Sequence, residues 1–125
     1  MLFRSWSGAA ALIAAHAAAR ITPAFVMNAL PYAGDTATMK VSYSDAPVSA
    51  HDMRFGLVVV LCALVPLAFV SILSVITGLL LGAIFAATIV LWARKLIGGY
   101  TGDVLGATEQ MFEIGFLLGV AAITR

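Results

Sequence analysis

Charged residues are scarce in this 125-residue chain: they make up 10% of it, against 62% hydrophobic residues. A soluble domain carries about a quarter charged residues. Seven basic residues against six acidic ones leave no basic surplus, and the longest basic cluster is Arg94-Lys95, which argues against nucleic-acid binding. The lone Cys62 excludes an intrachain disulfide and a multi-cysteine zinc site. The composition indicates a protein of the lipid bilayer.

Hydrophobic runs divide the chain into transmembrane segments. No charged residue occurs from Phe55 to Ala93, and about 20 apolar residues suffice to cross the hydrocarbon core. This run therefore predicts two spans, about 55–74 and 76–94, joined by a tight turn around Ser74 to Gly78. Two further spans are expected at about 8–30 and 104–123. The fold class is all-α: one polytopic membrane helix bundle over residues 1–125, with about four transmembrane helices.

One polar loop, 31–54, is long enough to be solvated. It is punctuated by Pro31, Gly34 and Pro47 and carries the charged or titratable residues Asp35, Lys40, Asp45, His51, Asp52 and Arg54. If the middle spans form a hairpin, this loop and Arg94-Lys95 lie on the same side of the membrane. Because Lys and Arg in short loops favour the cytoplasm, we expect both there, in a multi-pass protein of the cell inner membrane.

The alanine-rich start has a competing interpretation. Arg4, the apolar stretch from Ala9 to Ala15 and the Ala15-His16-Ala17 triplet together resemble a secretory signal with its cleavage site. The apolar pattern resumes through Ile21 and Val26, however, which favours a membrane span.

Ionisable residues inside the first and last spans are candidate site residues. His16 and Arg20 are four residues apart and share a helix face, as do Glu109 and Glu113. Such groups normally face a bundle interior or an aqueous cavity, so Arg20 is expected to pair with Glu109 or Glu113. Two alternatives stay open: Arg20 extends to the interface or precedes a span broken by Pro23, and the pair is purely architectural.

A glycine-rich acidic turn precedes the last span, Gly98-Gly99-Tyr100-Thr101-Gly102-Asp103. Glycines permit positive φ and close approach of a ligand to the backbone, and Thr101 or Asp103 can cap the next helix. A helix N-terminus of this kind suits phosphate. A carboxylate beside phosphate is expected where Mg²⁺ bridges the two, so Asp103 is a candidate metal ligand; the alternative is a capping residue.

This turn, with Gly106 to Glu113 after it and His16, Arg20 and Pro31-Tyr32 before it, resembles the C-terminal signature of the cobalamin synthase family. The resemblance implies a membrane transferase, adenosylcobinamide-GDP ribazoletransferase, which joins adenosylcobinamide-GDP and α-ribazole or its 5'-phosphate and releases GMP with Mg²⁺. Phosphoryl transfer depends mainly on positioning and charge neutralisation.

The resemblance implies specific roles for the candidate residues. Arg20, Asp103 and Glu109 would be catalytic, with Asp103 on the metal. Substrate would contact the remaining candidates, namely His16, Gly98, Gly99, Thr101, Gly102 and Glu113. The chain departs from the family pattern at Ala19, where serine is usual, and at Gly34, where arginine is common.

The aspartate-rich motif that the family carries in its N-terminal half does not occur in this sequence. The resemblance therefore covers the family's C-terminal half, and we expect a missing N-terminal half as partner and a chain inactive alone. A different class remains open: a small transporter or channel subunit with an intramembrane relay of His16, Arg20, Glu109 and Glu113.

Overall fold

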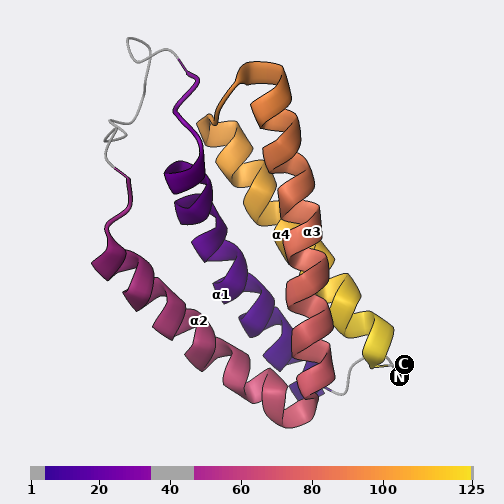
Figure 1. Cartoon of the computed structure of the whole chain (residues 1–125). Helices are drawn as coiled ribbons and strands as arrows, with labels where there is room; N and C mark the ends of the chain where they lie inside the picture. The colour runs from indigo at the N-terminus through magenta and orange to yellow at the C-terminus, as the bar shows by residue number, and fades with distance from the viewer. Residues whose placement is uncertain (1–4, 35–46, 125) are drawn as a thin grey trace.

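The computed structural model describes residues 5–34 and 47–124. Four helices follow in order: α1 (Ser5–Ala29), α2 (Ala50–Val70), α3 (Ile72–Ile97) and α4 (Gly102–Ile123). All four are long and apolar enough to cross a membrane. The chain is thus an all-α, multi-pass membrane protein. Figure 1 shows that α1 ends, α2 begins, α3 ends and α4 begins toward one end of the bundle, called here the loop end.

Helix α1 continues through Pro23 because a side chain replaces the missing backbone donor. Proline cannot donate to the carbonyl four residues earlier, which here belongs to Ala19. The Thr22 hydroxyl donates to that carbonyl at 2.7 Å. The span is therefore continuous from Ser5 to Ala29, and a span starting only after Arg20 is wrong.

The hairpin between α2 and α3 lies at Ser71, so the sequence-based turn at Ser74 to Gly78 is corrected. Ser71 is extended, its N–H donates to the Leu67 carbonyl at 2.9 Å, and its hydroxyl accepts from the Ser74 N–H at 3.2 Å. One serine thus ends α2 and begins α3. The small residues at 74–78 lie inside α3 and serve packing instead.

The start of α2 also differs from the expected loop. Ser49 caps the helix, since its hydroxyl accepts from the Asp52 N–H at 3.1 Å. The loop therefore ends before Ala50, and His51, Asp52 and Arg54 belong to α2. The loop residues Asp35, Lys40 and Asp45 lie outside the described residues.

Glycines bring α3 and α4 into backbone contact. A Cβ at Gly115 would lie 2.6 Å from the Leu81 carbonyl oxygen, and one at Gly119 would overlap the Thr77 carbonyl. The Thr77 hydroxyl donates across this seam to the Gly119 carbonyl at 3.0 Å. From α3, Gly78 and Gly82 accommodate the stacked rings of Phe116 and Phe112. Two pairs of glycines, each pair four residues apart, thus form the seam.

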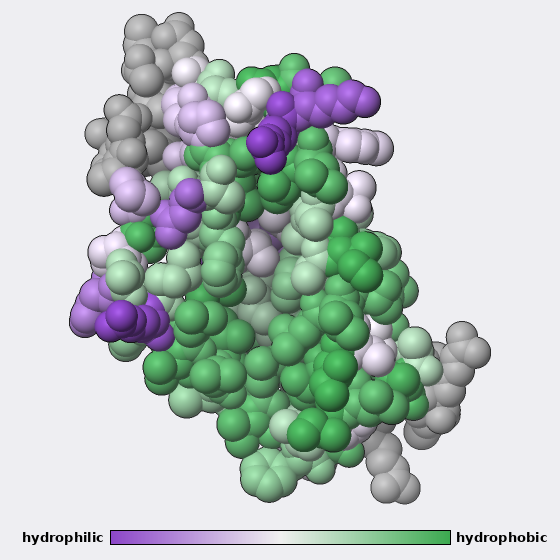
Figure 2. Space-filling view, in the orientation of Figure 1, coloured by the Kyte–Doolittle hydropathy of each residue, from purple (hydrophilic) through white to green (hydrophobic). Residues whose placement is uncertain are grey.

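The alanine-rich segment forms the inner face of α1. Its buried members are Ala10, Ala11, Ala14, Ala15, Ala18 and Ala19, all at most 6% exposed. They pack with Leu67, Phe112, Phe116 and Val120 in the main core. Small side chains let α1 approach its neighbours closely, which is the behaviour of a structural membrane span. Figure 2 shows an apolar lower surface, with hydrophilic residues gathered toward the loop end.

Candidate functional site

An ion pair links α1 to α4. Arg20 Nε lies 3.0 Å from Glu109 Oε1, and the Glu109 side chain is 15% exposed whereas that of Arg20 is 65% exposed. The spacing of charged residues in the sequence predicted this pairing with either Glu109 or Glu113; the packing of α1 against α4 selects Glu109. Guanidinium surface remains open toward the outside of the bundle.

A second contact lies one turn further along both helices. His16 Nδ1 is 3.8 Å from Glu113 Oε2, with side chains 59% and 24% exposed. Because α1 and α4 run in opposite directions, the i, i+4 pairs on each helix come together in reversed order. We call the four residues the acid–base ladder.

The ladder residues lie within two helices that are long and apolar enough to span a membrane. Exposed Trp6 and Trp92 stand near opposite ends of the bundle, as interfacial aromatics do. His16 follows Trp6 by ten residues, roughly 15 Å of helix, and the hydrocarbon core is roughly 30 Å thick. An unpaired arginine at the bilayer centre costs about 3 kcal/mol. Arg20 lies one turn nearer the loop end than His16 and lines a groove with Asp52, so Glu109 offsets part of such a penalty.

Beyond the ladder, away from the loop end, the seam between α1 and α4 becomes apolar. A cavity of about 530 Å³ is lined by Gly8, Leu12, Ile114, Leu117, Leu118 and Ala121. A proton or ion relay across the membrane needs polar groups at successive levels. The lining of this cavity supplies only hydrocarbon surface and glycine, so the ladder is a local polar site.

The glycine turn is held by backbone contacts with the segment that follows α1. The Tyr100 N–H donates to the Pro31 carbonyl at 2.9 Å, and the Ala33 N–H donates to the Tyr100 carbonyl at 2.8 Å. The rings of Tyr32 and Tyr100 meet edge to face at 5.5 Å. A Cβ at Gly99 would overlap the Pro31 carbonyl oxygen. In this structure Gly99 approaches the protein's own backbone closely, and a substrate contact there stays a prediction.

The remaining residues of the turn shape the helix ends. Gly98 ends α3 with φ 74°, a left-handed conformation that favours glycine. Thr101 caps α4, accepting from the Val104 N–H at 3.4 Å. Gly102 is the first residue of α4 and is exposed, so the N-terminus of α4 stays open at the loop end.

Asp103 is not grouped with the ladder. It is exposed in the first turn of α4 and lines a groove with α3 residues that include Trp92 and Leu96. Glu109 follows it by six residues, which places the two carboxylates about 120° apart around the helix. The expected catalytic set is thus split between two faces: Arg20 with Glu109, and Asp103 apart.

The described residues do not themselves form a metal centre. Within 5–34 and 47–124, no three His, Cys, Asp or Glu side chains come close enough to hold one ion. Mg²⁺ commonly uses one or two carboxylates together with substrate phosphates. Asp103 therefore fits a role as one ligand only, with the other ligands supplied from outside this set of residues.

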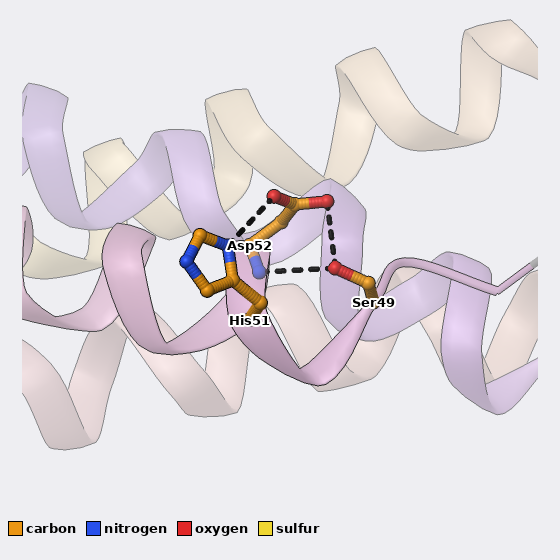
Figure 3. Close-up of polar contacts among 3 residues, drawn as sticks. All are labelled: Ser49, His51 and Asp52. Atoms are coloured by element: carbon orange, nitrogen blue, oxygen red, sulfur yellow. Dashed lines mark hydrogen bonds and ion pairs between the residues drawn. The ribbon is translucent and has the colours of Figure 1, made fainter.

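Sequence reasoning missed the polar cluster at the start of α2, shown in Figure 3. The Ser49 hydroxyl donates to Asp52 Oδ2 at 2.7 Å, and His51 Nδ1 lies 3.5 Å from Asp52 Oδ1. The Ser-x-x-Asp spacing is a variant of the capping box and was readable in the sequence. All three residues are exposed, and the arrangement fixes the start of the helix.

Fold and site together define a multi-pass helical membrane protein with two acid–base contacts between its first and last spanning helices. Residues 1–121 match the family described as Cobalamin-5-phosphate synthase, and the chain belongs to this family. The resemblance inferred from the glycine turn is therefore confirmed. No solved structure matches the chain.

Curated relatives carry the name adenosylcobinamide-GDP ribazoletransferase. The one from Polaromonas sp. is 32% identical over 95% of this chain and 43% of its own length. Those from Leptothrix cholodnii and Azorhizobium caulinodans are 36% and 35% identical, over 87% and 94% of this chain and 42% and 44% of their own lengths. The chain thus spans less than half the length of these relatives.

Proposed function

We propose that this chain provides the C-terminal helices of an adenosylcobinamide-GDP ribazoletransferase, a transferase in late cobalamin biosynthesis. The observation that carries the proposal is the family match over nearly the whole chain. The substrates would be adenosylcobinamide-GDP and α-ribazole or its 5'-phosphate. The rest of the enzyme would come from an N-terminal half, and the chain alone would be inactive.

The reaction proposed is phosphoryl transfer. An oxygen of an α-ribazole hydroxyl group bonds to the phosphorus that the corrinoid carries. The bond from that phosphorus to the GMP oxygen breaks, GMP leaves, and the hydroxyl proton passes to a base or to solvent. Because catalysis of this kind depends on positioning and charge stabilisation, a cationic side chain near the reacting phosphate is the contribution expected of this chain.

Arg20 is the candidate for that contribution. Its guanidinium is oriented by Glu109 and its side chain is 65% exposed, which would leave room for a phosphate. Arginine suits phosphate because its planar group donates two parallel hydrogen bonds. In the proposal, Glu109 positions Arg20, whereas His16 and Glu113 extend the polar surface on which a substrate group can lie.

The exposed loop end provides the second part of the proposal. Asp103 would contribute one carboxylate ligand to Mg²⁺, which when bound would neutralise phosphate charge. The open N-terminus of α4 at Gly102, with its Thr101 cap, would face an anionic group. We place this end in the cytoplasm and the protein in the cell inner membrane, because Arg94 and Lys95 lie at the same end.

The transporter alternative receives less support from the structure. The apolar cavity between Gly8 and Ala121 interrupts a polar path across the membrane on the side of the ladder away from the loop end. The acid–base ladder is therefore better suited to holding a charged group than to passing one across.

The proposal is tested by joining this chain to the N-terminal portion of the Polaromonas relative, in place of that protein's own matching segment. The fusion should release GMP from adenosylcobinamide-GDP when α-ribazole and Mg²⁺ are present, whereas this chain alone should not. Membrane insertion is checked by resistance to carbonate washing. Absence of GMP from a correctly inserted fusion would refute the activity.

Variants of the fusion then test the assigned roles. Arg20→Ala should reduce GMP release at least about a hundredfold, and Arg20→Lys should restore only part of it, because a point charge does not replace the bidentate donor. Asp103→Asn should raise the Mg²⁺ concentration needed for half-maximal rate. Arg94→Ala, which removes an exposed arginine at the loop end, is the matched control and should change the rate less than twofold. If Arg20→Ala lowers protein yield alone, the pair is architectural.

A further inference from the structure

The outer surface of the bundle has two chemically different parts. Helices α2 and α3 expose large aliphatic side chains, among them Leu61, Leu80, Ile84 and Leu91. No charged residue occurs between Phe55 and Ala93. Lipid tails solvate such a surface without cost, so these outer faces are suited to contact the bilayer directly.

Helix α1 exposes a different surface. Ala9, Ile13, His16 and Arg20 are all exposed, and their spacing of four, three and four residues places them on one side of the helix. We call this surface the open stripe. It carries His16 and Arg20 within a helix suited to span a membrane, where lipid tails offer neither hydrogen bonds nor counter-charge. A lipid-facing role is therefore disfavoured for the open stripe.

The stripe is also shaped for a helix. Ala9 and the neighbouring Ala17 are small, and small residues allow the backbones of two membrane helices to approach closely. Arg20 retains open guanidinium surface after its contact with Glu109. A helix lying along the stripe would thus meet small residues at Ala9 and Ala17, with hydrogen-bond donors on either side of Ala17.

A second copy of this chain does not supply hydrogen-bond acceptors to the open stripe. In a two-fold dimer with its axis along the membrane normal, each residue of the stripe lies at the same depth as its copy in the partner. Arg20 would then lie opposite Arg20 at bilayer depth, where like charges repel strongly. The covering element must present hydrogen-bond acceptors, which a second open stripe lacks at this level.

We propose that the open stripe is covered by a transmembrane helix from the N-terminal portion of a full-length cobalamin synthase. This helix presents an acceptor side chain to one guanidinium N–H of Arg20 and leaves two others for the proposed phosphate contact, since a guanidinium has five N–H donors and Glu109 accepts from Nε. The chain corresponds to 43% of the Polaromonas relative, so more than half of that protein lies outside the matched segment. The inference rests on the proposed function in taking the rest of that enzyme as the partner.

Photocrosslinking in the fusion described above tests the proposal. A benzophenone amino acid is placed at Ile13 in the open stripe, or at Ile84 on α3 as the matched control; the two are 56% and 58% exposed. A protease site at the junction separates the two portions after irradiation. Crosslinking should hold them together when the probe is at Ile13, and not when it is at Ile84.

Two bulky substitutions provide an independent measurement that leaves both ladder contacts in place. After cleavage at the junction, Ile13→Trp should lower the amount of N-terminal portion that copurifies with this chain at least about fivefold, the effect of overpacking a close helix contact. Ile84→Trp should leave it unchanged. Crosslinks from Ile13 to lipid alone, to a second copy, or at the same yield as from Ile84 would overturn the proposal. These readouts do not depend on GMP release, so an inactive fusion with the expected crosslinks would refute the activity and retain the interface.

Discussion

Replacing Gly115 by alanine should force α3 and α4 apart, whereas the same change at Gly106 should not. A Cβ added at Gly115 would lie 2.6 Å from the Leu81 carbonyl oxygen, 2.9 Å from its carbon and 3.0 Å from the Gly82 Cα. All three are backbone atoms, so no side chain can rotate away. At Gly106 an added Cβ has no neighbour within 4 Å.

The expected magnitude follows from three contributions. Separating the helices by roughly 0.5–1 Å is an overpacking cost of about 1–3 kcal/mol. Weakening the Thr77 to Gly119 hydrogen bond adds about 0.6 kcal/mol. Alanine's better helix propensity returns about 1 kcal/mol at either position. Gly115→Ala should therefore lower the free energy of unfolding by about 0.5–2.5 kcal/mol, and Gly106→Ala should raise it by up to about 1 kcal/mol.

Unfolding in mixed detergent micelles, followed by circular dichroism against the SDS fraction, measures this difference directly. The two variants carry the same chemical change on the same helix, so effects on detergent binding or expression cancel in the comparison. Equal midpoints for Gly115→Ala and Gly106→Ala would refute the claim that glycine at 115 is required by backbone contact.

Two further substitutions test local devices of the fold. Thr22→Val keeps the shape of the side chain but removes the hydroxyl that donates to the Ala19 carbonyl. It should lower the free energy of unfolding by about 1–3 kcal/mol in the same assay. An unchanged midpoint would show that the carbonyl finds another partner. Gly99→Ala should disrupt the contact with the Pro31 carbonyl and make the turn more susceptible to protease. Gly98→Ala is strained by its φ of 74° but lies in open space, so it should cost only about 1 kcal/mol and change the protease susceptibility less. Equal rates of cleavage in the two variants would contradict the contact.

The sequence was sufficient to predict the helix count and the ladder. Apolar runs define four spans, and the i, i+4 spacing of Arg20 with His16 and of Glu109 with Glu113 restricts how α1 and α4 can pair. The split between Asp103 and Glu109 was also readable, since six residues correspond to different sides of a helix. Treating the two carboxylates as one site overlooked this geometry.

Other features depend on tertiary contacts that local sequence does not encode. Ser71 and Ser74 have the same capping chemistry, so either could separate α2 from α3. The packing of Gly78 against Phe116 keeps residues 74–78 inside α3 and leaves Ser71 as the break. Similarly, glycine at 99 is compatible with a ligand or with a neighbouring segment of the chain. The Pro31 carbonyl, nearly seventy positions away in the chain, requires glycine there on its own.

Packing of α4 on α3 also controls the candidate site. Gly115 follows Glu113 by two residues, about 200° around the helix, so the glycine seam and the acid–base ladder lie on opposite sides of α4. A rigid helix transmits a displacement at one side to the other. Separating α4 from α3 by even half an ångström would therefore move Glu109 relative to Arg20, whose contact is 3.0 Å. The glycines that pack α4 against α3 thus also determine where its carboxylates lie relative to α1.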